Sequence, residues 1–375
     1  MQQYEYDFTV PLRRMDQLFA GFFPWLAKQY DFASGGFFYA ASSRLSAALA
    51  ADIESTAQAL NILERNGLIA AIPEWLKERL VRFFQAKQDP ASGYFYDRDP
   101  LMRKDEVMVS RAIAYATGSL QKLGAPPLYA LPVQASAAPD YLASVASYAK
   151  WLRDIDLRNS WRGCDRMASS GPYVAQLPGP EKTEYIRTAL DYFAEIQHPQ
   201  TGLWGDGSLY CRISGTFKLH TFYGKFNRPM PHAESIYQSI LNCLRTENAT
   251  DMCYIRNPIN LLTYLRVQIP LHELYEIIDI TVSNMARLKR PDGGFSREIG
   301  NSPSAPNVAQ VKNGEFYPVM PKPVRLSLGL YEGDMNAGTQ AHLLRLQCYK
   351  LANLAPPPLP EAAAFYKLLE NNARA

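Results

Sequence analysis

The sequence predicts an all-helical protein, and three observations predict it. Alternation of apolar and polar residues with a period of two, the pattern of a half-buried strand, is nearly absent. Apolar residues recur instead at helical spacing: Ile53, Leu60 and Leu63 fall on one face of the segment 48–66, and Gly67 follows as a stop. The segments that join these helices repeat, which is typical of an architecture built from helical hairpins.

The expected helices are of two alternating kinds. The segment 73–87, which opens with Pro73, is amphipathic and highly charged, whereas 48–63 is rich in small residues. An amphipathic helix belongs in an outer layer and a helix with small residues nearly all round in an inner one. Asp140 is the expected N-cap of the segment 140–157. The expected helical segments are 11–28, 48–66, 73–87, 103–123, 140–157, 160–178, 182–197, 213–226, 231–247, 251–267, 271–289, 334–352 and 360–373.

Four of the joining segments share one pattern, in which a helix is followed by a tight turn, a glycine and an aromatic residue. In three of them a proline stops the helix. The glycine supplies the positive φ of the turn, and the aromatic side chain packs back between helices. The glycines are Gly35, Gly93, Gly202 and Gly294, and the aromatic residues are Phe37, Phe95, Trp204 and Phe295.

The turns QDPASGYFYD, QHPQTGLWGD and KRPDGGFS resemble the glutamine–tryptophan-type repeats of the terpenoid cyclase and protein prenyltransferase superfamily. The segment DIESTAQALNILERNGL resembles the inner helix that follows such a turn there. The resemblance covers most of the chain and implies a single domain, 1–375, folded as an α/α toroid of about six helical hairpins around a central cavity. Carbohydrate-active enzymes share this fold, so the fold alone does not select a reaction. The implied inner helices are 48–66, 103–123, 160–178, 213–226, 251–267 and 334–352.

Composition excludes several classes of protein. With 47% hydrophobic and 20% charged residues, the chain can form a large core. Its 39 basic and 36 acidic residues are spread evenly, so we expect no nucleic-acid partner. The first residues lack the pattern of a secretory signal, and no run approaches the roughly 18 apolar residues of a membrane span. Five scattered cysteines favour reduced thiols and a cytoplasmic location.

The segment 296–330 breaks the helical pattern. It carries several prolines and no periodicity. A loop this long in a compact domain is either disordered or a functional lid, and both alternatives stay open. Phe316, Tyr317 and Val319 could pack against the domain if the loop is a lid.

Inner helices that begin at one mouth of a ring would bring their N-terminal turns together around the cavity. Their unpaired N–H groups suit an anionic ligand, so charged and polar residues of these turns are the site candidates. The candidates are Asp52, Glu54, Asp105, Glu106, Arg111, Arg162, Asp165, Arg166, Lys218, His220, Asp251, Cys253, Tyr254, Asp334, Asn336 and Thr339.

Three of these residues and Tyr223 receive specific roles. His220 and Tyr223 are the expected proton-transfer pair, and Asp334 is a further candidate general acid or base. Lys218 would bind a carboxylate or diphosphate of the substrate, and we expect all three of Lys218, His220 and Tyr223 to line one cavity with Asp334 and Asn336. The structural alternatives are a core helix and a helix cap. The remaining predicted substrate contacts are Arg166, Asn336, Trp204 and Tyr254, and for Trp204 the favoured alternative is a turn plug or core residue.

The run Asp251-Met-Cys253-Tyr254 resembles the Asp-x-Cys-Tyr element that supplies two zinc ligands in protein prenyltransferase β subunits. His342 is the only third ligand that order along the chain allows. The family's ligand position falls on Gly338, however, one turn before His342. The alternative is an N-cap Asp251 beside a buried free Cys253, and it is the favoured one, so we expect no metal or other cofactor.

Two enzyme classes and one non-catalytic class follow from these patterns. The resemblance implies an enzyme acting on an isoprenoid or another anionic substrate in the cavity. Its diagnostic acids are missing, because Asp154-Ile-Asp156 and Asp97-Arg-Asp99 lack a third acid and are expected to be solvated charges. The alternative is a carbohydrate-active enzyme, a polysaccharide lyase or glycoside hydrolase, with an acidic oligosaccharide as ligand. The third hypothesis is a helical scaffold without catalysis.

Overall fold

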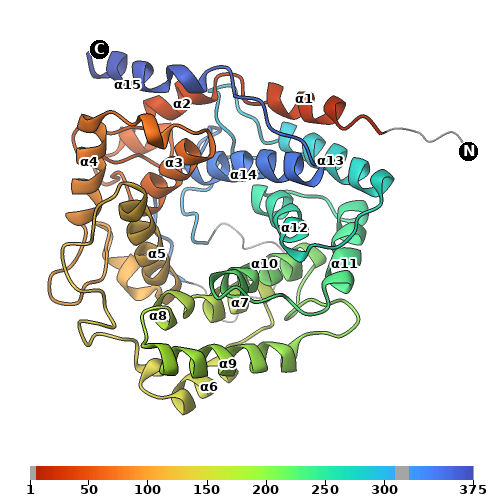
Figure 1. The fold of residues 1–375 in the computed structure, drawn as a ribbon. Coiled ribbons are helices and arrows are strands. Elements are labelled where there is room, and N and C mark those ends of the chain that lie inside the picture. The colour runs from red at the N-terminus through yellow and green to blue at the C-terminus, as the bar shows by residue number, and fades with distance from the viewer. Residues whose placement is uncertain (1–5, 309–320, 375) are drawn as a thin grey trace, which may run out of the picture. The chain divides into compact units, whose positions relative to one another are not determined.

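The computed structural model describes residues 6–308 and 321–374. Helices take up 57% of the chain, and within the described ranges there is no strand, only isolated β-bridges at turns and helix starts (Figure 1). The predicted all-helical class is therefore confirmed. No helix in these ranges is both long enough and apolar enough to span a membrane.

The chain forms two compact units, each assembled from separate segments. Unit 1 contains residues 1–79, 241–306 and 325–375, and unit 2 contains residues 80–240 and 307–324. Two helices, α4 (Glu74–Gln85) and α11 (Ala233–Thr246), run from one unit into the other along the chain. The single domain expected over 1–375 stays a prediction.

Unit 1 is organised around α14, which contacts α1, α3, α12 and α13. The first eight residues of α14 are all buried, as expected for a helix rich in small residues. The helices of this unit are α1 (Thr9–Gln17), α2 (Phe22–Lys28), α3 (Ile53–Arg65), α12 (Met252–Leu265), α13 (Leu271–Ala286), α14 (Met335–Leu351) and α15 (Phe365–Arg374), with short 3₁₀ turns η1 (Ala41–Leu45), η2 (Ile69–Ala71) and η5 (Ala362–Ala364).

Unit 2 is built on the close packing of α7 against α10. A Cβ added at Gly215 of α10 would lie 2.0 Å from Ser160 Oγ of α7, so glycine is what allows this approach. The start of α7 also lies near α5, and α6 packs on α9. The helices of this unit are α5 (Glu106–Lys122), α6 (Val145–Arg153), α7 (Ser160–Ala168), α8 (Gly171–Val174), α9 (Gly179–Ile196) and α10 (Leu209–Lys225), with 3₁₀ turns η3 (Pro100–Lys104) and η4 (Asp140–Leu142).

The repeated turn has one backbone geometry in both units. The glycine N–H donates to the carbonyl four residues earlier at Gly35, Gly93 and Gly202, and each of these glycines has a positive φ. The fourth turn corrects the sequence prediction, because its positive φ belongs to Gly293 and not to Gly294. That turn is one residue shorter, so the left-handed position comes one residue earlier. Gly294 is needed for space, since a Cβ there would lie 2.7 Å from Trp25 Cε2.

Several expected helix boundaries differ from those observed. Gly21, with φ 76°, divides the segment 11–28 into α1 and α2. Ser144 caps α6 through its Oγ, which accepts from Ser147 N at 3.1 Å, while the expected cap Asp140 begins η4. The segment 160–178 forms two helices, α7 and α8.

The described ends of the loop 296–330 are anchored by hydrogen bonds within each unit. In unit 1, Ser302 N donates to Leu330 O at 2.8 Å. In unit 2, Asn307 Nδ2 donates to Lys322 O at 2.9 Å, and its Oδ1 accepts from Val324 N at 3.0 Å. Phe316, Tyr317 and Val319 lie outside the described residues, so the lid stays a prediction.

Candidate functional site

The catalytic candidates of α10 lie farther along their helix than the sequence suggested. The helix begins at Leu209, where Ser208 Oγ accepts from Cys211 N at 3.2 Å. Lys218, His220 and Tyr223 therefore lie beyond the first turn, and the prediction that Lys218 and His220 occupy an N-terminal turn is wrong. Residues 209–212 carry no helical periodicity of apolar residues, so the sequence does not indicate this earlier start.

Lys218 has a carboxylate partner inside unit 2. Its Nζ lies 3.0 Å from Asp165 Oδ1, with 16% of the lysine side chain and 9% of the aspartate side chain exposed. The ammonium also lies 5.8 Å from the ring centre of Trp161. Burial opposes ionisation of Asp165, but the charges of Lys218, Arg111 and Arg162 lower its pKa overall. This pair accounts for a largely buried lysine side chain on α10.

The other candidates from this part of unit 2 make contacts typical of packing. His220 Nδ1 lies 2.6 Å from Phe217 O of its own helix. Tyr223 is 3% exposed, and its ring packs near Trp204. Trp204 is fully buried, and its Nε1 donates to Phe193 O at 2.8 Å, as a turn plug would. The catalytic and substrate-binding roles of these residues stay predictions.

In unit 1, Asp334 is a fully buried N-cap. Its Oδ1 accepts from Ala337 N at 2.8 Å, which caps α14. Its Oδ2 accepts from Arg297 N at 2.7 Å and from Ser302 Oγ at 3.0 Å. Burial raises the pKa of Asp334 to about 6, against these hydrogen bonds and the charge of Arg297. All three hydrogen bonds are made to the protein itself, so the geometry favours a structural role.

Arg297 joins Asp334 to the start of α12. Its Nε lies 3.4 Å from Asp251 Oδ2, and its Nη1 donates to Pro306 O at 2.7 Å. Asp251 in turn caps α12, with Oδ1 accepting from Cys253 N at 2.7 Å. We call Asp251, Arg297, Ser302 and Asp334 the Arg297 cluster. Its four side chains are between 0% and 4% exposed.

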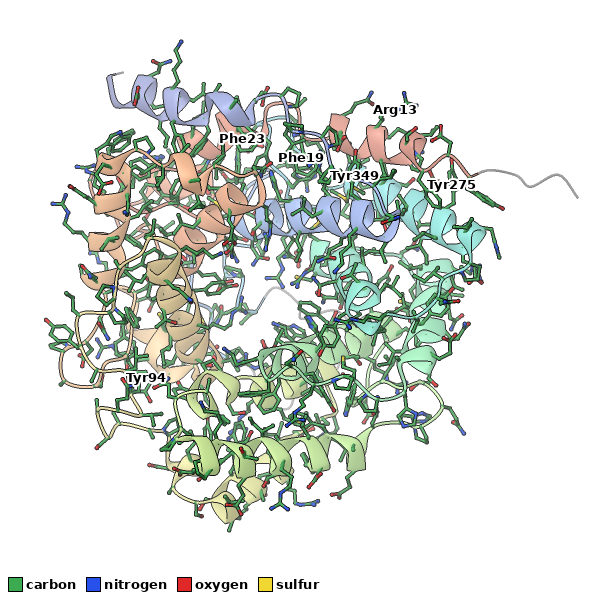
Figure 2. All side chains as sticks on the ribbon, in the orientation of Figure 1. Arg13, Phe19, Phe23, Tyr94, Tyr275 and Tyr349 are labelled. Atoms are coloured by element: carbon green, nitrogen blue, oxygen red, sulfur yellow. The ribbon has the colours of Figure 1, made fainter. Side chains whose placement is uncertain are left out.

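The weak metal candidates are not assembled as a metal site. Nδ1 of His342 lies 3.0 Å from Gly338 O, and the ring packs against Phe19 and Phe23, which Figure 2 labels. Burial lowers the pKa of His342 to about 3. Across residues 6–308 and 321–374, no three His, Cys, Asp or Glu side chains form a group that could hold a metal ion. Asp251 and Cys253 instead form the start of α12.

Asn336 belongs to a row of polar side chains on α3, α14 and α12 of unit 1. Its Nδ2 lies 3.4 Å from Glu54 Oε1, and its Oδ1 accepts from Gln340 Nε2 at 2.6 Å. Arg256 Nε continues the row by donating to Gln340 Oε1 at 3.2 Å. Tyr254, on α12, is 5% exposed. The expectation that Asn336 and Asp334 share one cavity with the α10 candidates stays a prediction.

Unit 2 contains a cavity of about 400 Å³ with charged walls, which we call the charged cavity. The first turns of α5 and α7 both contribute to its lining. Arg166, predicted to bind substrate, is part of its wall. The lining residues are Leu101, Lys104, Asp105, Glu106, Val107, Ile155, Asp156, Arg162, Gly163, Arg166, Pro321 and Lys322.

Two ion pairs connect α5 to α7 across this cavity. Arg162 Nη2 lies 2.9 Å from Asp105 Oδ1, and only 3% of the Asp105 side chain is exposed. Asp105 also caps α5 by accepting from Val107 N at 3.1 Å. Arg166 Nε lies 3.2 Å from Glu106 Oε2, and about a third of the Glu106 side chain is exposed. The first pair is structural, while the second faces solvent.

Glu106 favours its protonated form more than an ordinary glutamate does. Burial raises its pKa, although the charges of Arg166 and Arg162 act in the opposite direction. Its Oε1 is buried and has no hydrogen-bond partner among the residues that the structure describes. The carboxylate lies near Tyr141, whose pKa is raised by burial and by Glu106, and the Tyr141 ring stacks on Trp151 at 4.1 Å. Glu106 is one of the candidates at a predicted helix start, and the sequence alone indicates no specific role for it.

Asp156 is a second carboxylate on the same wall, and its pKa is shifted the other way. Side-chain and backbone hydrogen bonds from Arg158, including Nε to Oδ1 at 3.0 Å, lower the pKa of Asp156. The residue was expected to be a solvated charge, and its side chain is 31% exposed at the wall of the charged cavity. A Cβ at Gly163 would lie 2.6 Å from Asp156 O, so a glycine of α7 allows this segment to approach.

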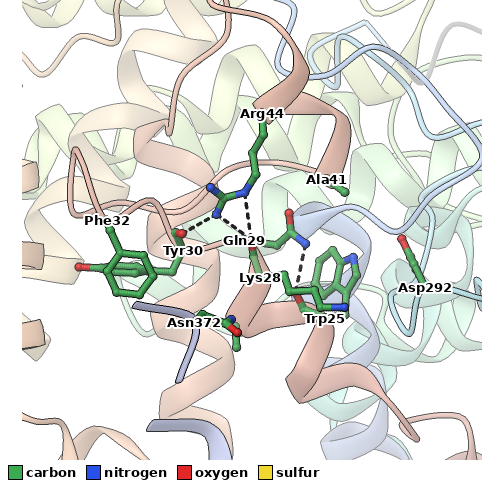
Figure 3. Close-up of a pocket in the computed structure, with 10 residues that line it drawn as sticks. Trp25, Lys28, Gln29, Tyr30, Phe32, Ala41, Arg44, Asp292 and Asn372 are labelled. Atoms are coloured by element: carbon green, nitrogen blue, oxygen red, sulfur yellow. Dashed lines mark hydrogen bonds between the residues drawn. The ribbon is translucent and has the colours of Figure 1, made fainter. Parts of the chain in front are cut away.

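Unit 1 contains a cavity of about 540 Å³ beside the end of α2 (Figure 3). Two of its polar side chains are bound to backbone: Arg44 Nη2 donates to Lys28 O at 2.6 Å, and Gln29 Nε2 donates to Trp25 O at 3.1 Å. Asp292 holds two turns through the N–H groups of glycines. These contacts leave less chemistry available than in the charged cavity.

Comparison with known proteins supplies no further assignment. No family model matches the chain, and no curated protein is similar to it.

Proposed function

We propose that the charged cavity is the active site of a glycoside hydrolase, with Glu106 and Asp156 as its two carboxylic acids. The observation that carries this proposal is that two carboxyl groups line one cavity and have pKa values shifted in opposite directions. Environments that separate two pKa values in this way mark out an acid and a base. Hydrolysis of a glycosidic bond needs such a pair.

Glu106 would be the general acid. Its raised pKa keeps a proton available for the glycosidic oxygen, whose protonation lets the leaving sugar depart. The buried Oε1 supplies the desolvation that raises the pKa, and Oε2, on the side of Arg166, is the oxygen that would deliver the proton. Arg166 therefore positions the carboxyl group.

Asp156 would act on the opposite side of the scissile bond. Its lowered pKa keeps it ionised, so it can activate a water molecule or attack the sugar carbon directly. The lining includes the apolar residue Leu101, which is partly exposed and could contact a sugar ring. The charged side chains around it suit the hydroxyl groups of a sugar.

The test is release of reducing ends from a panel of polysaccharides, with uronate-containing and neutral members. We expect Glu106→Gln to lower kcat by about 10²–10⁴-fold, the usual contribution of a general acid. The matched control is Glu181→Gln, because Glu181 is also a first-turn glutamate of a unit 2 helix but is exposed and absent from the cavity. If the Glu106→Gln variant hydrolyses a glycan as fast as the unchanged protein does, the assignment is contradicted. It is also contradicted if the unchanged protein hydrolyses no member of the panel.

An isoprenoid substrate is the second candidate, and the turn resemblance supports it. The cations of the charged cavity would also suit a diphosphate. The backbone N–H groups at the starts of α5 and α7 would favour the same anion. Release of pyrophosphate from a prenyl diphosphate, with no reducing ends released from glycans, would favour this candidate.

The α/α toroid of about six hairpins also belongs to the proposal, with an oligosaccharide as ligand and no nucleic acid as partner. The repeated turn and the buried, small-residue character of α14 support the toroid. A cytoplasmic location is supported by the cysteines, all five of which are free and buried.

A further inference from the structure

The carboxylates of the charged cavity are already neutralised. Each one has an arginine partner at ion-pair distance. The cavity's charge selectivity therefore depends on the cations that remain. The pairs are Asp105 with Arg162, Glu106 with Arg166, and Asp156 with Arg158.

Two further cations, Lys104 and Lys322, line the same cavity. No carboxylate in the part of the chain that the structure describes forms an ion pair with either of them. Both side chains are exposed. The cavity wall thus has an excess of positive charge, which grows further when Glu106 is protonated.

The backbone positions of both lysines are fixed. Lys104 ends η3, a turn capped by Asp99, whose Oδ1 accepts from Leu101 N at 2.9 Å. Lys322 is held by Asn307, which is 8% exposed and donates to Lys322 O at 2.9 Å. Long flexible side chains on fixed backbone positions can reach into the cavity and bind a ligand by its charge.

We propose that Lys104 and Lys322 bind acid groups of the substrate, so that the charged cavity takes an anionic glycan with carboxylate or sulfate ester groups. Unneutralised cations in a cavity raise the local concentration of anions, and carboxylate or sulfate oxygens accept charge-assisted hydrogen bonds from ammonium groups. The choice of a glycan rests on the proposed function, whereas the anion selectivity rests on the charges alone.

Binding is measured by isothermal titration calorimetry on the Glu106→Gln protein, so that no turnover contributes. The probes are an oligogalacturonate, its neutral carboxyl-reduced counterpart, a sulfated oligosaccharide and inorganic sulfate. We expect Lys104→Gln with Lys322→Gln to weaken oligogalacturonate binding by about tenfold or more, because two charged contacts are lost. Carboxyl reduction should weaken binding by a similar factor. The matched control is Lys182→Gln with Lys367→Gln, which removes the same charge outside the cavity and should leave binding unchanged.

Each outcome decides a separate point. Equal binding of the acidic and neutral oligomers, equal binding by the two double variants, or no binding of either acidic oligosaccharide would overturn the inference. Inorganic sulfate that binds as tightly as the oligomers would show a simple anion site and overturn the choice of a glycan. The acidic oligomers could bind in a lysine-dependent way and yet not be cleaved by the unchanged protein. That result would support the anion site and refute the proposed hydrolase.

Discussion

The Arg297 cluster of unit 1 and the charged cavity of unit 2 are built from the same residue types at the same kind of position. In both, acids at the start of buried helices meet arginines. In the Arg297 cluster, every contact is made within the protein, and the side chains are almost fully buried. In the charged cavity, Glu106 stays partly exposed beside Arg166, and two lysines have no carboxylate partner within residues 6–308 and 321–374.

The difference teaches that burial of the arginine, and not the presence of the acid, separates a structural cluster from a candidate site. Arg297 is 4% exposed and donates to a backbone carbonyl as well as to a carboxylate. Arg166 has 43% of its side chain exposed. A buried ion pair that loses one partner leaves an uncompensated charge, whereas an exposed one contributes little. Substitutions should therefore affect stability in the first region and ligand chemistry in the second.

The largest effect is expected for Arg297→Met. It leaves Asp251 and Asp334 buried without their cation and should lower the free energy of unfolding by about 3–5 kcal/mol in urea titrations. The control is Arg14→Met, which breaks the exposed pair with Asp279 and should cost about 1 kcal/mol or less. If the two variants lose the same free energy of unfolding, the Arg297 cluster does not behave as a buried charge cluster.

Asp334 should make stability depend on pH in a defined direction. Its folded pKa of about 6 exceeds the unfolded value of about 3.9, so the protonated form favours the folded state. This stabilisation is complete below about pH 4 and is lost as pH rises through about 6, by roughly 3 kcal/mol in total. The comparison is with Asp334→Asn, which cannot titrate. The stability of the unchanged protein minus that of the variant should fall between pH 4 and 6, and a constant difference would contradict the raised pKa.

An intermediate effect is expected for Lys218→Met. Because the lysine pairs with a nearly buried Asp165, its loss should lower the free energy of unfolding by about 2 kcal/mol. A melting temperature that hardly changes, together with weaker binding of an anionic ligand, would instead restore Lys218 to the site predicted from the sequence.

The smallest change in stability is expected for Glu106→Gln. The amide oxygen can still accept a hydrogen bond from Arg166, and no buried charge is left behind. The free energy of unfolding, measured by thermal unfolding, should therefore change by no more than about 0.5 kcal/mol. The substitution should instead change the pH profile of hydrolysis. In the unchanged protein, the alkaline limb of that profile should lie above the usual pKa of a glutamate. A large loss of stability would place Glu106 with the Arg297 cluster.

Local patterns predicted much of the fold. The apolar face of α3, the proline before α4 and the four glycine–aromatic turns are all properties of short segments, and the structure contains them. The start of α10 was missed because Ser208 and Gly207 determine it without any periodic signal. The site was harder to predict, because Asp334 and Glu106 look alike as acids at helix starts. What separates them is a contact with a residue many positions away, Arg297 in one case and Arg166 in the other.

Because all five cysteines are buried, the rate at which each thiol is labelled reports how often its unit opens. Alkylating reagents attack thiolates, and burial both raises the pKa of thiols such as Cys164 and Cys348 and blocks access to them. Labelling therefore waits for a local opening event. Cys164 and Cys211 report on unit 2, and Cys243, Cys253 and Cys348 report on unit 1. Peptide-resolved alkylation rates would time the opening of both units in a single reaction, without introducing any foreign probe.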